Sequence, residues 1–240
     1  FQRVASPKAV VESLGFKKKG GRGIMFKKVV LAAFVLSLVF AVSSFAADPI
    51  KIQFAGYHPP VHMVSNLISE FCDEVNKRTN GKVAATPYTG GTLLSATKMA
   101  AGVYSGIADI GFSHCAYSRG RFPVMEIMEL PLGFPSSWIA SHVSNDFYNK
   151  FKPKEWNNYH VLFFTTSPVN VIQTVKKPVN TIEDLKGMKI RGTGRSGDIV
   201  KALGATPMPI ETPDLYEAIK RGVVDGAYLT METYKGFKTG

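Results

Sequence analysis

The sequence is poor in the residues that build disulfide frameworks and common catalytic centres. It holds two cysteines, Cys72 and Cys115, and five histidines among 240 residues. Two cysteines make no disulfide framework, and we expect two separate thiols because one belongs to an expected helix and the other to a strand end. The motifs H-E-x-x-H and C-x-x-C and a defensible Ser-His-Asp spacing are also missing. We therefore expect no metal, no cofactor and no enzymatic activity.

Long apolar runs are scarce too, and the only one stands near the beginning. Val29–Val42 is apolar except for one serine, follows a pair of lysines and leads into small residues. This pattern predicts a secretory signal peptide over Met25–Ala46, with a hydrophobic core of about 14 residues and cleavage after Ala46 or, as second choice, after Ala47. An uncleaved membrane anchor is the alternative, because a span takes about 20 apolar residues. We expect the rest of the chain to work in the periplasm.

Residues 1–24 come before the expected start at Met25. Lys19-Gly20-Gly21 can be encoded by a purine-rich tract that resembles a ribosome-binding site, so we interpret residues 1–24 as an untranslated leader; a genuine basic extension is the alternative. Of the net charge of +11, residues 1–24 carry +5 and Lys27 and Lys28 carry +2. The remaining +4 is weak support for a nucleic-acid partner, and we expect none.

After residue 47, strand patterns alternate with helix patterns, which is typical of an α/β fold with helices packed on a sheet. The first part is expected to contain strands at Ile50–Ala55, Val83–Tyr88 and Ile107–Phe112, helices at Val64–Val75, Ser95–Tyr104 and Ser137–Phe151, and a further strand at Val161–Thr165. The second part is expected to contain strands at Val169–Val175, Met188–Arg191 and Val223–Leu229, a capping box for a short helix at Thr181–Asp184, a helix at Asp198–Leu203, and a helix from Thr212, as N-cap, to Gly222.

One pattern occurs twice. Ser105–Ile110 and Arg221–Gly226 each end a helix with glycine and open a strand with aspartate at the same offset. The repeat suggests two α/β lobes of similar design, residues 48–167 and 168–240, with the second lobe incomplete because the sequence stops soon after a strand. Ligands of such proteins bind at strand ends or between lobes.

The sharpest local motif is the glycine-rich segment 192–197, which reads G-x-G-x-x-G between an expected strand and an expected helix. No acidic residue is clearly placed about 20 positions later, so a dinucleotide site is disfavoured. A helix N-terminus still attracts anions, and Arg191 ends the preceding strand with a guanidinium suited to a carboxylate. The segment therefore predicts an anion site, with an ordinary surface arginine as the alternative.

Several aromatic and histidine side chains are expected at strand ends. His58 and His62 are separated by two prolines, so a helical two-histidine metal face is disfavoured. His114 could contact a ligand or be an ordinary loop residue. Tyrosines at strand ends commonly line ligand pockets and are equally common in cores; they are Tyr57, Tyr117, Tyr228 and Tyr234.

Taken together, the motifs resemble the solute-binding subunits of TRAP (tripartite ATP-independent periplasmic) transporters, the DctP-like family. The resemblance runs from Ile50 to Gly240. It rests on the order and spacing of FAGY (54–57), FCDEVNKRTNG (71–81), YTGGTLL (88–94), GIADIGF (106–112), GRFP (120–123), IEDLKGMKIR (182–191), ALGATP (202–207) and GVVDG (222–226).

The resemblance implies a two-lobe periplasmic-binding-protein fold whose cleft closes on a small organic acid and delivers it to the membrane permease subunits of a TRAP transporter. A monomer is expected. In this family the arginine of the KIR-type strand binds the ligand's carboxylate, and the corresponding residue here is Arg191. By position, further ligand contacts are expected from Tyr57, His58, His114, Tyr117, Thr193 and Gly194, with Gln173 and 229–232 as weaker candidates.

The chain also departs from the family pattern. Gly192-Thr193-Gly194 replaces the usual Val-Pro after the arginine, and the second arginine of the sialic-acid type is missing near Val171. The latter favours a smaller or more aromatic carboxylate. Two alternatives remain open: a binding subunit that serves a sensor or another uptake system, and an exported α/β enzyme.

Overall fold

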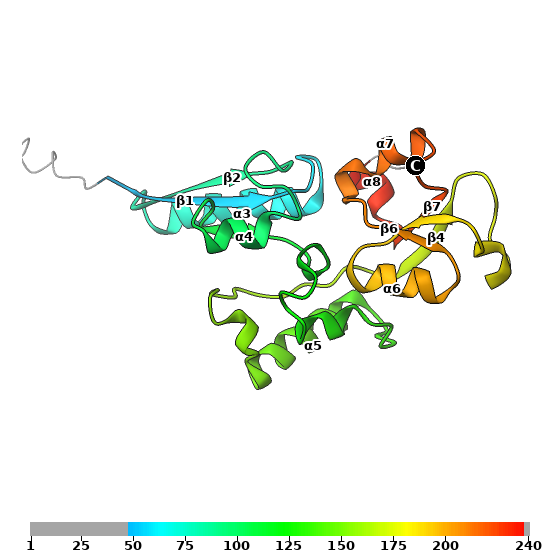
Figure 1. Ribbon diagram of the computed structural model, residues 1–240. Coiled ribbons are helices and arrows are strands. Elements are labelled where there is room, and N and C mark those ends of the chain that lie inside the picture. Colours follow the sequence, from blue (N-terminus) through cyan, green and yellow to red (C-terminus); the bar gives the residue numbers. More distant parts are fainter. Residues whose placement is uncertain (1–47, 238–240) are drawn as a thin grey trace, which may run out of the picture. The chain divides into compact units, whose positions relative to one another are not determined.

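The computed structural model describes residues 48–237 (Figure 1). The expected leader at 1–24 and the expected signal peptide at 25–46 lie outside these residues. Within 48–237, no helix has the length and apolar character that crossing a membrane requires.

The first sheet contains three parallel strands in the order β2-β1-β3. Its strands are β1 (Ile50–Gly56), β2 (Val83–Tyr88) and β3 (Ile110–Phe112), and its helices are α3 (Met63–Arg78) and α4 (Met99–Tyr104). The apolar side of α3 packs on the sheet through Ile68 and Cys72, which contact Phe54 and Ala85. Burial of these side chains holds α3 on the sheet and so fixes the position of the residues at the end of β1.

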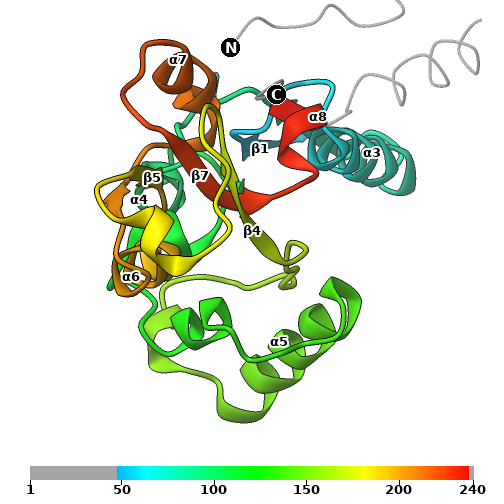
Figure 2. The ribbon, with the colours of Figure 1, turned by 90° about the vertical axis from the view of Figure 1, so that its right-hand side faces the viewer.

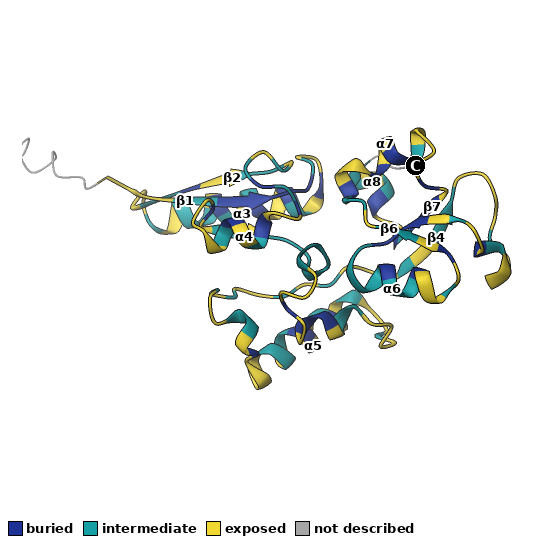
Figure 3. Ribbon diagram, in the orientation of Figure 1, coloured by how far each residue is buried: buried dark blue, intermediate teal, exposed yellow. Residues whose placement is uncertain are grey.

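The second sheet contains four strands in the order β4-β7-β5-β6, with β4 antiparallel to β7 and the other pairs parallel. Its strands are β4 (Asn170–Thr174), β5 (Lys189–Arg191), β6 (Thr206–Met208) and β7 (Gly226–Thr230). Its helices are α6 (Gly194–Ala202) and α7 (Leu215–Lys220). Two apolar clusters hold them, one around Leu215 and Ala227 and one around Ile190 and Val200 (Figure 3).

The repeated glycine–aspartate pattern has the same structure in both places. Gly106 and Gly222 have positive φ angles of 76° and 69°, and each ends the helix before it. The Asp109 carboxylate then accepts a 2.8 Å hydrogen bond from the backbone N–H of Gln53 in β1. The Asp225 carboxylate accepts one of the same length from Lys189 in β5. Each aspartate thus fastens a helix-to-strand turn to the neighbouring parallel strand.

The strand expected at Val161–Thr165 is wrong, because this extended segment pairs with no strand. Its backbone is bonded instead by side chains of α5 (Ser137–Phe151). The amide of Asn145 bonds both the N–H and the carbonyl of Phe164, at 2.9 and 2.7 Å, and the Ser141 hydroxyl accepts from the N–H of Thr166 at 2.9 Å. These bonds replace the ladder that a sheet would supply.

Several element boundaries differ from those expected. The helix expected from Ser95 begins at Met99, and the one expected from Asp198 begins at Gly194. Thr212 is not an N-cap: it starts the 3-10 turn Thr212–Asp214 (η5), whose N-cap is Glu211, and α7 follows. Strand β6 and the short helix α8 (Thr233–Phe237) were not expected from the sequence.

The capping box expected at Thr181–Asp184 is confirmed, although it caps the 3-10 turn Ile182–Leu185 (η4). Other 3-10 turns occur at Cys115–Ser118 (η1), Met125–Glu129 (η2) and Lys154–Trp156 (η3). Both cysteines are free thiols, as expected. Residues Pro49–Gly240 form one compact unit that contains both sheets. The division into lobes at residues 167 and 168 stays a prediction.

Candidate ligand site

Arg191 is the last residue of β5 and is buried, with 5% of its surface exposed. Its Nε donates a hydrogen bond of 2.9 Å to the carbonyl oxygen of Ile210. Its Nη2 donates to the hydroxyls of Thr212, at 2.9 Å, and Tyr117, at 3.2 Å. The guanidinium is thus held in one orientation by neutral oxygen atoms of three residues.

The charge of Arg191 has no counter-ion in the described part of the chain. No carboxylate of residues 48–237 comes within the 4.0 Å that defines an ion pair with its guanidinium. A buried charge without an opposite charge is costly, and hydrogen bonds to neutral groups offset only part of that cost. An incoming carboxylate would supply the missing charge, and Nη1 is the nitrogen left to bind it, because Nε and Nη2 already donate to Ile210, Thr212 and Tyr117.

A group of aromatic and histidine rings adjoins Arg191. Tyr57 follows β1 directly, and its ring stands edge-on to Tyr117, with the ring centres 5.3 Å apart. The ring of His58 stacks on the ring of Tyr57, with the ring centres 4.1 Å apart. The ring centre of His114 lies 6.3 Å from those of both Tyr57 and Tyr117. The structure therefore brings together five of the residues predicted as ligand contacts; their role in binding stays a prediction.

Two further rings complete this group. His62 is the N-cap of α3, where its Nδ1 accepts from the N–H of Val64 at 3.1 Å. Phe237 of α8 packs against it with ring centres 5.2 Å apart, so α8 lies beside the start of α3 (Figure 2). We call the six rings of Tyr57, His58, His62, His114, Tyr117 and Phe237 the ring cluster. Among residues 48–237, no three His, Cys, Asp or Glu side chains are placed to hold a metal ion.

The ring cluster is electrically neutral near pH 7. Burial, together with His62 and His114, lowers the pKa of His58 to about 3. Burial, Arg191 and His62 lower the pKa of His114 to about 4. Burial also raises the pKa of the Tyr57 hydroxyl above its ordinary value. Arg191 is therefore the one source of positive charge that this group of described residues offers to a ligand.

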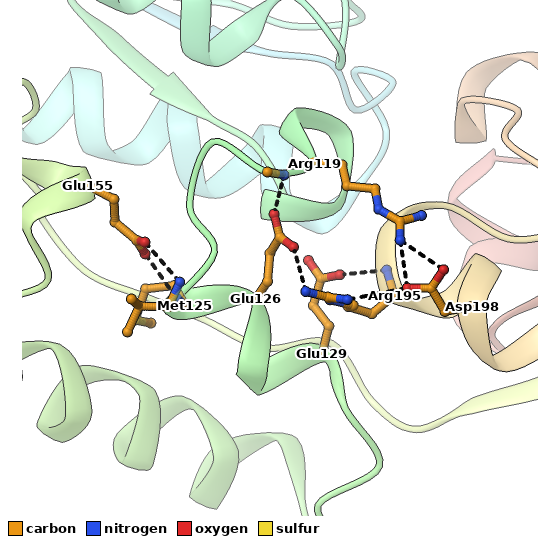
Figure 4. Close-up of polar contacts among 9 residues, drawn as sticks. Arg119, Met125, Glu126, Glu129, Glu155, Arg195 and Asp198 are labelled. Carbon is orange, nitrogen blue, oxygen red and sulfur yellow. Dashed lines mark hydrogen bonds and ion pairs between the residues drawn. The ribbon is translucent and has the colours of Figure 1, made fainter.

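The N-terminus of α6 is already occupied by a carboxylate of the protein (Figure 4). Glu129 of η2 accepts a hydrogen bond from the N–H of Arg195 at 3.2 Å, and buried Glu126 lies 3.4 Å from the Arg195 side chain. Arg119, which follows η1, adds a further link to α6 through Asp198. The expected anion site, formed jointly by Arg191 and this helix N-terminus, is thus reduced to Arg191.

The three other predicted site residues make contacts outside the ring cluster. Gly194 has a φ of 53°, and a Cβ atom there would come within 2.8 Å of Ala116 and of the Glu129 carboxylate. Thr193 precedes it as the N-cap of α6 without a side-chain capping bond. Gln173 lies on β4, where its amide donates to the carbonyl of Leu229 at 3.0 Å. Their contact with a ligand stays a prediction.

The residue that the sequence did not reveal is Thr212. Its hydroxyl is 2.8 Å from that of Tyr117 and accepts from Arg191, so it joins the two groups. The motif Thr-Pro-Asp predicts a helix cap, and nothing local signals that the hydroxyl bonds to an arginine 21 residues earlier. Only the pairing of β5 with β6 brings the two together.

Comparison with known proteins identifies a family that the chain matches. Residues 54–239 match a family model described as DctP, bacterial extracellular solute-binding protein, family 7. The 2,3-diketo-L-gulonate-binding periplasmic protein YiaO of Escherichia coli is 26% identical over 207 residues, which cover 83% of this chain and 62% of that protein. The chain thus spans less than two thirds of the length of such curated relatives.

Two solved structures are similar as well. A TRAP periplasmic solute-binding protein from Desulfovibrio salexigens, an open complex, is 39% identical with a TM-score of 0.64, covering 80% of this chain and 60% of that one. A marine metagenome TRAP solute-binding protein, described as specific for aromatic acid ligands and holding 3-hydroxybenzoate, is 26% identical with a TM-score of 0.75. That match covers 80% of this chain and 61% of the other.

Proposed function

This chain belongs to the DctP family of bacterial extracellular solute-binding proteins, and from that membership we propose that it captures a small organic carboxylate and delivers it to the membrane permease subunits of a TRAP transporter. Solute-binding proteins bind and release a ligand without converting it, in keeping with the lack of catalytic motifs. The proposal includes export to the periplasm by a cleaved signal peptide at 25–46 and action as a monomer.

The observation that carries the proposal is the buried Arg191 guanidinium without a counter-ion among the described residues. Its orientation is fixed before any ligand arrives, so a carboxylate meets a pre-organised donor and loses little affinity to ordering. Exclusion of water around the pair then strengthens the ionic hydrogen bonds.

The ring cluster supports a ligand with a flat or apolar body. It places Tyr57 and Tyr117 next to the arginine, and burial keeps the neighbouring histidines uncharged. The resemblance to the family also implies that the second arginine of the sialic-acid type is missing at or near Val171, which argues for a smaller or more aromatic acid. The similar protein that is described as specific for aromatic acids supports the same ligand class.

A thermal-shift screen of small organic acids against the purified protein tests the proposal, because a ligand that binds the folded state raises its melting temperature. Arg191→Ala should abolish every carboxylate-induced shift. Arg191→Lys, which keeps the charge but not the fork, should reduce the affinity and preserve some response. An equal response in all three proteins would contradict the assignment of Arg191.

Delivery and export have separate tests. In cells that carry the matching permease, uptake of the identified acid should require this protein and should be lost with Arg191→Ala. Mass spectrometry of the exported protein should show an N-terminus at Ala47 or Asp48. Size-exclusion chromatography with light scattering should give a monomer mass.

A further inference from the structure

His58 is the most unusual polar side chain of the ring cluster. It is 4% exposed, and its Nδ1 is buried with no hydrogen-bond partner among the described residues. Its backbone carbonyl, by contrast, accepts from the Ser65 hydroxyl at 2.9 Å and from the N–H of Gly90 at 2.7 Å. The backbone of His58 is therefore fixed, while its ring is left with an unused polar atom.

The surroundings of His58 explain neither a structural nor a charged role for that atom. Its ring is enclosed by the rings of Tyr57, His62, Phe112, His114 and Phe237, at centre-to-centre distances of 4.1 to 6.3 Å. A phenyl ring there would leave no polar atom unpaired. His62 differs, because its Nδ1 caps α3. An imidazole at position 58 is thus costly for folding unless something outside the chain bonds it.

The chemistry of that partner follows from the charge state of the ring. Burial and the two neighbouring histidines lower the pKa of His58 to about 3, so the imidazole is neutral near pH 7. A neutral imidazole offers one donor and one acceptor. It suits a hydroxyl group, which can both donate and accept, better than a second carboxylate, which needs a positive charge.

The order of contacts from Arg191 to His58 indicates the order of groups in the ligand. Tyr117 contacts Arg191, Tyr57 adjoins Tyr117, and His58 stacks on Tyr57. One ring, that of Tyr57, therefore lies between the residue that touches the arginine and the unpaired imidazole. A ligand that follows these rings has its carboxylate at one end, an aromatic body in the middle and a polar group at the other end.

We propose that His58 is a specificity-determining residue that binds the hydroxyl group of a hydroxylated aromatic monocarboxylate whose carboxylate is held by Arg191. This inference rests on the proposed function, because it assumes that Arg191 binds the carboxylate. It adds a second polar contact at the far end of the ligand and excludes aromatic dicarboxylates as the preferred class.

The test compares benzoate, 3-hydroxybenzoate, 4-hydroxybenzoate and isophthalate by isothermal titration calorimetry. One of the hydroxybenzoates should bind about 3- to 10-fold more tightly than benzoate, the gain of one hydrogen bond to a neutral group. Isophthalate should bind more weakly than benzoate. In His58→Phe, which keeps the stacking, the preference for the hydroxyl should vanish while benzoate binding persists.

The matched control is His142→Phe, the same exchange at an exposed histidine of α5, for which the hydroxyl preference should survive. If His58→Phe fails to fold, the wild-type ratio of hydroxybenzoate to benzoate affinity still decides. A ratio near one in the wild type, or a ratio unchanged by His58→Phe, overturns the inference while leaving carboxylate binding intact. No binding of any of these acids, nor of any acid in the thermal-shift screen, would instead overturn the proposed function.

Discussion

The two sheets share a framework and differ in what they place at the ends of their strands. In each, an aspartate after a helix-ending glycine bonds the neighbouring parallel strand, Asp109 to β1 and Asp225 to β5. Yet β1 leads into the neutral rings of Tyr57 and His58, whereas β5 ends in the charge of Arg191. The difference shows that the same turn can hold a strand in place in both sheets while the residues at the strand's end are neutral in one and charged in the other.

The sheets also differ at the residue after the aspartate. It is Ile110 in the first sheet and Gly226 in the second. Strand β3 is an edge strand with space for a side chain, while β7 has β4 on its other side. A Cβ atom at Gly226 would overlap the backbone carbonyl of Gln173 in β4. The extra antiparallel strand therefore dictates the glycine.

The largest expected effect is the loss of stability on substitution of Gly226. Gly226→Ala forces β4 away from β7 and should lower the free energy of unfolding by about 3 kcal/mol, as for an overpacked core. Ile110→Val at the equivalent edge position should cost about 1 kcal/mol. Urea denaturation followed by circular dichroism measures both. Equal losses would mean that β4 does not constrain this position.

A pH effect should separate the ring cluster from the rest of the molecule. Because the pKa of folded His58 is about 3, the unfolded chain takes up a proton near pH 6.5 that the folded chain refuses. Stability is therefore complete above pH 6.5 and falls as the pH drops. From pH 6.5 to 5, His58→Phe should lose about 2 kcal/mol less than the wild type.

Urea midpoints at both pH values give this difference. His142→Phe is the control, since His142 is exposed on α5 and the wild-type slope should persist. An unchanged slope in His58→Phe would show that His58 is protonated in the folded protein.

A smaller effect tests whether the two glycine–aspartate turns contribute equally to stability. Asp109→Ala and Asp225→Ala each leave one backbone N–H of the adjacent strand without its partner, and each should cost about 1 kcal/mol. Asp→Asn at either position keeps an acceptor oxygen and should restore most of the loss. Thermal denaturation of the four variants would test this, and a marked inequality between the alanine variants would end the analogy.

The smallest effect concerns the link between η1 and α6. Arg119 bonds both oxygens of Asp198, but the two side chains are 55% and 44% exposed. Water and salt screen such pairs, so Arg119→Gln should change the unfolding midpoint only marginally, and not at all in high salt. A large loss would show that this contact orients α6 behind Arg191.

Regular, locally encoded features could be predicted from the sequence. The apolar spacing of α3 and the glycine–aspartate repeat depend on neighbours in the chain, and both agree with the structure. The motifs also pointed to Arg191 and Tyr117, which the structure joins. Glu129 at the N-terminus of α6 could not be foreseen, because its partner is 66 residues away. The segment 161–165 looked like a strand because its bonding groups belong to α5.

That segment has a consequence for how such a protein can change over generations. A strand in a sheet is held by many backbone bonds that no single substitution removes. The passage from α5 to β4 is instead anchored by the side chains of Asn145 and Ser141. The packing of this segment thus depends on a few side chains. Substitution of Asn145 or Ser141 can loosen or tighten the connection between the two sheets without altering either sheet.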